Sequence, residues 1–200
     1  TFVVACRVWM SVTGSLPPDV TILIEGEEAV GSKNVMPFLE NVTRGRDVPR
    51  RRLEVVADHY LHFGGVSPIN EQNRALAVAV TADLAARGVD LPVYLGNRNW
   101  RPYVGDVVAE MADAGLRNAL VFTTSAYASY SACRQYQDDL ASAAAPLGTT
   151  APELHKLRHY FDHPGFIEPQ RDALREALAA VADRTTSRVV FVAHSIPESM

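Results

Sequence analysis

The residues best suited to chemistry follow an apolar run at positions 188–192, where Ala193, His194, Ser195 and Pro197 stand. The run consists of β-formers and is typical of a strand buried in a parallel sheet. Because ligands of open α/β sheets bind at the carboxyl ends of strands, His194 lies where chemistry is usual. Its imidazole could accept a proton near neutral pH or ligate a metal ion. A histidine that only caps the strand through a backbone hydrogen bond is the alternative, and position alone leaves both open.

A second group of candidate residues follows two other predicted strands, at 92–96 and 119–122. If these strands are parallel, the residues after them gather at one rim of the sheet: Arg98, Trp100, Tyr127 and Tyr130. Aromatic rings there either pack within the protein or stack on a flat ligand. Three arginines either lie solvated at the surface or bind carboxylates of a ligand in a bidentate manner, namely Arg44, Arg46 and Arg98. The pattern favours a planar, acidic ligand without identifying it.

Other chemistries have weaker support. His59 and His62 are three residues apart on a predicted helix and could pair on a metal ion, although a surface role is the favoured interpretation. Ser195 lacks the flanking glycines of a hydrolase nucleophile elbow. The chain contains neither the glycine-rich dinucleotide motif nor the P-loop, so nucleotide binding is unsupported.

The elements that position these residues alternate between strand and helix. Strands are predicted at 20–24, 92–96, 119–122, 154–160 and 188–192, with helices at 37–42, 49–63, 70–88, 102–115, 134–145 and 169–182. This alternation predicts an α/β fold, a doubly wound parallel sheet of Rossmann-like kind, with strands 119–122 and 189–192 both interior. In the helix from Pro49, we expect Leu53, Val56, Tyr60 and Phe63 to face inward, and Asn70 to cap the next helix.

Composition indicates an ordinary globular protein: 200 residues, 48% hydrophobic and 21% charged. A net charge of -4 and a pI of about 5.8 argue against nucleic acid as a partner. No apolar run reaches the roughly 20 residues that a membrane span needs. Two cysteines, Cys6 and Cys133, give no disulfide framework and favour the cytoplasm. We expect a monomer, and a chain that is incomplete, since it starts without Met and stops shortly after His194.

Several sequence blocks, taken in order, resemble the ferrochelatase family, in particular the coproporphyrin ferrochelatases of actinobacterial type. The blocks are PFLENVTRGR at 37–46, HYLHFGGVSPIN at 59–70, GNRNW at 96–100, TSAYASYS at 124–131, YFDHP at 160–164 and AHSIP at 193–197. The resemblance divides the chain into a diverged segment at 1–34, with a first strand, and a chelatase-like α/β domain at 35–200. It implies two Rossmann-like halves around a porphyrin cleft, of which the second half is not in this chain.

The resemblance implies a lyase that inserts Fe²⁺, its substrate, into coproporphyrin III or protoporphyrin IX during haem synthesis. His194 corresponds to the family's active-site histidine, as a metal ligand or as the acceptor of pyrrole N–H protons. One tyrosine of the pair Tyr127 and Tyr130, with Tyr130 favoured, would face the metal from the other side of the ring. Arg44, Arg46 and Ser67 lie in segments that line the cleft and could meet porphyrin propionates, and Arg98 and Tyr127 are further porphyrin-binding candidates. Some members also carry a [2Fe–2S] cluster.

One departure from the family concerns residues 25–31, EGEEAVG, where the family has an aromatic–glycine–x–proline loop. Carboxylates at this position would repel an anionic porphyrin. Gly105 also replaces an expected acidic residue. The alternative function is therefore a truncated module that binds porphyrin or metal without catalysis.

Overall fold

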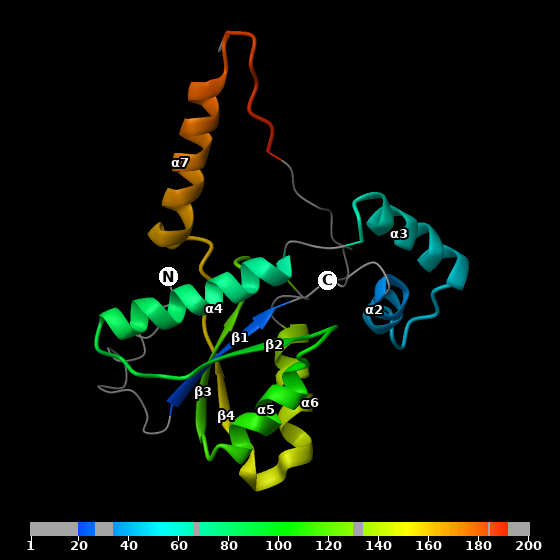
Figure 1. Cartoon of the computed structure of the whole chain (residues 1–200), viewed down its shortest axis with the longest axis vertical. Helices are drawn as coiled ribbons and strands as arrows, with labels where there is room; N and C mark the ends of the chain where they lie inside the picture. The colour runs from blue at the N-terminus through cyan, green and yellow to red at the C-terminus, as the bar shows by residue number, and fades with distance from the viewer. Residues whose placement is uncertain (1–19, 27–33, 66–68, 130–133, 184, 192–200) are drawn as a thin grey trace.

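A computed structural model of the protein describes residues 20–26, 34–65, 69–129, 134–183 and 185–191 (Figure 1). Three of the residues assigned above to the site, His194, Tyr130 and Ser67, lie outside these ranges, as do both cysteines. The predicted cleft residues Arg44, Arg46, Arg98 and Tyr127 lie inside them.

The centre of the fold is a sheet of four parallel strands, β1 (Val20–Gly26), β2 (Val93–Asn97), β3 (Asn118–Thr123) and β4 (Glu153–Lys156), in the order β2-β1-β3-β4. Ile24 of β1 pairs with Leu95 on one side and with Phe122 on the other. β2 pairs with one side of β1, and β3 pairs with the other side, so the direction in which strands are added reverses between β1 and β3. The α/β parallel prediction and the interior position of residues 119–122 are thereby confirmed.

Helices cover both faces of this sheet (Figure 1). On one face, α4 (Ile69–Ala86) places Val80 and Leu84 against Ile22 and Ile24. On the opposite face, α5 (Val104–Asp113) and α6 (Tyr136–Ala144) pack against Leu23 and its neighbours. The period of two along β1 sends alternate side chains into the two layers, and the three-layer core follows from it.

A helix pair with its own small core stands beside the sheet. It consists of α2 (Val35–Val42) and α3 (Arg50–His62), which bury Val35, Phe38, Leu39, Leu53 and Ala57 together. Val56 and Tyr60 pack against this cluster as the spacing predicts. Phe63 does not: it follows the last helical residue and is 82% exposed, because the chain turns away there into Gly64 and Gly65, both at positive φ.

Two further expectations at the helix ends are wrong or displaced. Asn70 lies inside α4, which begins at Ile69, so it is not the N-cap. The last helix, α7 (Pro164–Ala180), begins five positions before the predicted start at 169, because Pro164 suits its first turn and His163 caps it. The imidazole Nδ1 of His163 accepts a hydrogen bond from the backbone N–H of Gly165 at 3.0 Å.

The prediction of an interior strand at 189–192 is also wrong for the part that the structure describes. Residues 188–191 form no strand, and Val190 and Phe191 are 75% and 88% exposed. Within the described ranges, β4 closes the sheet at that edge, and α7 buries none of its residues and runs away from the sheet (Figure 1). Without a buried face on α7, no packing force returns residues 188–191 to the sheet.

Candidate functional site

The loop after β2 is held tightly to the end of its strand. The backbone N–H of Asn97 donates to the carbonyl of Pro102 at 2.7 Å, and its side-chain Nδ2 donates to the carbonyl of Arg101 at 3.3 Å. Asn97 is fully buried, and its Oδ1 has no hydrogen-bond partner among the described residues. Gly96 beside it allows α5 to approach, because a Cβ at that position would lie 3.1 Å from the Val104 Cα.

The same loop carries the α2–α3 pair at the rim of the sheet. The ring of Trp100 meets Phe38 edge-on, with centroids 6.4 Å apart, so this predicted rim aromatic packs within the protein. Asn41 at the end of α2 donates from Nδ2 to the Tyr103 hydroxyl at 3.0 Å and to the Asn99 carbonyl at 3.4 Å. The helix pair is thus attached to the carboxyl end of β2 by one aromatic contact and two hydrogen bonds.

Two of the predicted cations, Arg44 and Arg46, follow α2 close to the point where it is attached to the loop after β2. Arg44 donates from Nη2 to Asn41 Oδ1 at 2.6 Å, which orients its guanidinium through the residue that bonds to the rim loop. Arg46 follows in a tight turn, in which its N–H donates to the Thr43 carbonyl at 2.9 Å. Both arginines are exposed and available to an anionic ligand at the rim.

Arg98 occupies a different environment from the other two arginines. Its side chain is 9% exposed, its Nε lies 2.6 Å from Asp139 Oδ2 on α6, and its guanidinium lies 5.2 Å from the centroid of the Tyr136 ring. The interpretation of Arg98 as a solvated surface charge is therefore wrong. The residue ties the loop after β2 to α6.

The loops after β3 and β4 meet in a cluster of aromatic rings. Tyr127 lies beside Phe161, with centroids 6.4 Å apart and planes at 18°, and it meets Phe166 edge-on at 6.0 Å. Tyr160 stacks on Phe122 of the core at 4.9 Å, and burial raises the pKa of its hydroxyl above the ordinary value. Tyr127 packs against these two rings and still remains 60% exposed.

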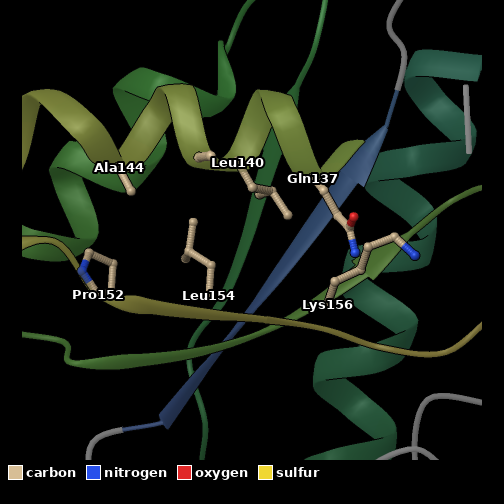
Figure 2. Close-up of a pocket in the computed structure, with 7 residues that line it drawn as sticks. Gln137, Leu140, Ala144, Pro152, Leu154 and Lys156 are labelled. Carbon is tan, nitrogen blue, oxygen red and sulfur yellow. The ribbon is translucent and has the colours of Figure 1, made fainter. Parts of the chain in front are cut away.

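A shallow groove between α6 and β4 lies apart from these loops (Figure 2). The groove has a volume of about 360 Å³. Its apolar lining consists of Leu140, Ala141, Ala144, Pro152 and Leu154, and its two polar side chains are Gln137 and Lys156. None of the described residues that the sequence assigns to the site lines it. His59 and His62 are exposed on α3, and the described residues contain no cluster of three His, Cys, Asp or Glu side chains suited to a metal ion.

The sequence reasoning did not single out three residues that shape the rim, namely Asn41, Asp139 and Phe161. Asn41 and Phe161 stand inside blocks that carry the family resemblance, so a signal existed for them. Asp139 gave no such signal. An acidic residue on a helix can pair with a neighbour one turn away or with a residue far away in sequence, and the sequence alone does not distinguish the two.

The parallel sheet, with its loops gathered at the carboxyl ends of the strands, defines an α/β domain of the Rossmann-like class, in which ligands commonly bind at this rim. A sequence model described as Ferrochelatase matches residues 26–200, and the chain belongs to the ferrochelatase family. No helix in the described part of the chain is long and apolar enough to cross a membrane.

Individual relatives agree with this family. The chain is 62% identical over 169 residues to a coproporphyrin III ferrochelatase of Mycolicibacterium vanbaalenii, covering 84% of this chain and 50% of the relative. It is 58% identical over 181 residues to the protein of that name from Mycolicibacterium smegmatis, covering 90% and 53%. For Streptomyces coelicolor the identity is 52% over 188 residues, covering 92% and 50%. The chain therefore spans about half the length of these relatives.

Proposed function

We propose that this chain forms one wall of a porphyrin cleft in an enzyme that inserts Fe²⁺ into coproporphyrin III, with protoporphyrin IX as the alternative substrate. The observation that carries the proposal is the match to relatives named coproporphyrin III ferrochelatase at 52–62% identity. The rim supports it physically, because exposed arginines and open aromatic rings suit a flat ligand that bears carboxylates.

The reaction exchanges two pyrrole N–H protons for one Fe²⁺, so it needs a proton acceptor near the ring centre and no covalent intermediate. We assign acceptance of these protons, or ligation of the entering iron, to the imidazole of His194. Tyr130 would face the iron from the other side of the ring. A positioned base of this kind contributes roughly 10²–10⁴-fold to a rate.

Binding of the porphyrin carboxylates falls to Arg44, Arg46 and Ser67. The 2.6 Å hydrogen bond to Asn41 holds Arg44 at the rim, where a bidentate contact to a propionate costs little further ordering. Arg98 does not join this set, since its guanidinium is already paired with Asp139. A [2Fe–2S] cluster is commonly held by four cysteine thiolates, and this sequence contains only Cys6 and Cys133, so its cysteines alone would not hold one.

The second candidate function is a module that binds porphyrin or metal without catalysis. The observation that favours it is the segment EGEEAVG at 25–31, which carries three carboxylates where the family resemblance implies an uncharged loop facing an anionic porphyrin. A cytoplasmic location is proposed from the presence of only two cysteines, and the expectation of a monomer remains a prediction.

The test uses the chain extended to the length of its relatives and follows metallation by the loss of free-porphyrin absorbance. His194→Ala should lower the rate by about 10²–10⁴-fold, whereas His59→Ala, on the exposed side of α3, should keep most of it. Similar losses in both variants would defeat the assignment. Porphyrin binding without metallation in the unsubstituted protein would favour the binding module.

A further inference from the structure

We infer that Phe161 is a substrate-positioning residue, which forms with Tyr127 an exposed aromatic wall against which the flat face of a tetrapyrrole stacks. The inference rests on the proposed function and adds to it a binding residue and the way that it acts. The two rings lie nearly parallel, at 18°, with centroids 6.4 Å apart. Tyr127 is 60% exposed and Phe161 44%, so part of each ring faces solvent.

A relay of ring contacts fixes this wall to the core of the domain. Phe166 meets Tyr127 edge-on, and it meets Tyr160 in the same way with centroids 5.4 Å apart. Tyr160 in turn stacks on Phe122, a buried residue of β3. Because each ring is held by the next, the orientation of Tyr127 is set by packing that begins inside the sheet.

The backbone around Phe161 is fixed as well. Arg158 and Asp162 form an ion pair at 3.0 Å across the turn, and the N–H of His163 donates to the Tyr160 carbonyl at 3.0 Å. Tyr160 takes the inward place against Phe122, so its neighbour Phe161 is left on the outside. Phe161 and Tyr127 together form a contiguous exposed aromatic patch, and a patch of this kind is a surface that a ligand can cover.

The chemistry of this wall matches a planar macrocycle. Aromatic planes prefer offset stacking at centroid separations of about 4.5–7 Å, and Tyr127 and Phe161 are already stacked in this way, so a further planar ring can continue the stack on the part of the pair that is open to solvent. The wall lies at the carboxyl ends of β3 and β4, on the edge of the sheet where ligands bind. The phenyl ring of Phe161 has neither an ionisable group nor an atom that ligates a metal ion. Its effect should therefore be on the affinity and pose of the porphyrin, and not on the metallation step itself.

The experiment separates these two effects in the chain extended to the length of its relatives. Phe161→Leu should raise the Kd for coproporphyrin III, measured by Soret titration, about three- to tenfold. The kcat at saturating porphyrin should stay within about twofold, and Phe161→Tyr should restore the affinity. Ile167→Ala is the matched control, because Ile167 is 45% exposed on nearby α7 and should leave the Kd unchanged.

A second measurement covers the case in which Phe161→Leu disturbs the turn. In a double-mutant cycle with Tyr127→Leu, the losses in affinity should be clearly non-additive, as for two rings that act as one surface. An unchanged Kd in Phe161→Leu, failed rescue by tyrosine, or an equal loss in Ile167→Ala would overturn the inference while leaving the proposed function intact. An unsubstituted protein that binds no porphyrin would overturn both.

Discussion

Arg98 and Asp139 meet in an ion pair with 2.6 Å between Nε and Oδ2, which joins the loop after β2 to α6. The arginine side chain is almost fully covered, and the carboxylate is about 29% exposed. Cations at the rim therefore differ in kind: Arg44 and Arg46 are presented to solvent, whereas Arg98 holds the loop that carries Trp100.

Removing one partner of this pair should strongly destabilise the domain. Arg98→Met leaves the carboxylate of Asp139 without its cation in a partly buried place, and we expect the free energy of unfolding to fall by about 3–5 kcal/mol. The double variant with Asp139→Leu should recover much of that loss, because no uncompensated charge remains. Urea unfolding followed by circular dichroism measures both.

The pair between Arg87 and Asp83 on α4 is the control, since its Nε–Oδ2 distance of 3.0 Å is also that of a direct ion pair but both side chains are exposed. Arg87→Met should change stability by no more than about 1 kcal/mol. Equal losses at the two arginines would show that the burial of Arg98 contributes nothing.

Two glycines nine residues apart provide a matched prediction about the end of β2. Gly96→Ala would place a Cβ 3.1 Å from the Val104 backbone, so α5 must shift, and we expect a loss of about 1–3 kcal/mol in unfolding free energy. Gly105→Ala, inside α5, meets nothing within 4 Å and should gain about 0.5–1 kcal/mol from helix propensity. Thermal melts of the two variants should move in opposite directions, and a drop in both would contradict this geometry.

Much of this fold was predictable because it follows from local patterns. The apolar runs at 20–24 and 119–122 and the helical spacing of Val104, Val107, Val108 and Met111 each reflect burial that acts within one element. The run at 188–192 shows the limit of such reasoning. It has the same β-forming pattern, but whether a strand joins a given sheet depends on how the preceding helix packs, and α7 buries no residue.

The site was predictable to a smaller degree. The rim position of Tyr127 and the exposed state of Arg44 follow from strand order and a turn. That Arg98 pairs with Asp139, and that Trp100 packs on Phe38, depends on contacts between segments far apart in sequence. No spacing rule encodes such contacts, so a buried cation and a free one looked the same.

The hydrogen bond between Asn41 and Tyr103 should couple the α2–α3 pair to the rim. Asn41→Ala removes the donor to the Tyr103 hydroxyl and the acceptor of Arg44, and Tyr103→Phe removes only the hydroxyl. We expect a coupling free energy of about 0.5–1.5 kcal/mol in the double-mutant cycle for unfolding. Asn41→Ala should also speed proteolysis in the exposed loop at 43–49, whereas Glu54→Ala on the outer side of α3 should not. Strict additivity of the two substitutions would show that the bond does not contribute.

The stability of the aromatic cluster should depend on alkaline pH through Tyr160. Burial raises the pKa of its hydroxyl, so the side chain stays neutral in the folded protein at a pH where the unfolded chain ionises near its ordinary value of about 10. The unfolded state then binds fewer protons, and the stability falls as the pH rises from about 10 through the folded pKa, whereas below 10 Tyr160 contributes no slope. Tyr160→Phe keeps the ring on Phe122 and removes the ionisable group. Unfolding free energies at pH 8 and at pH 11 should therefore decline less in Tyr160→Phe than in the unsubstituted protein, and an identical decline would mean that the hydroxyl is solvated in the folded state.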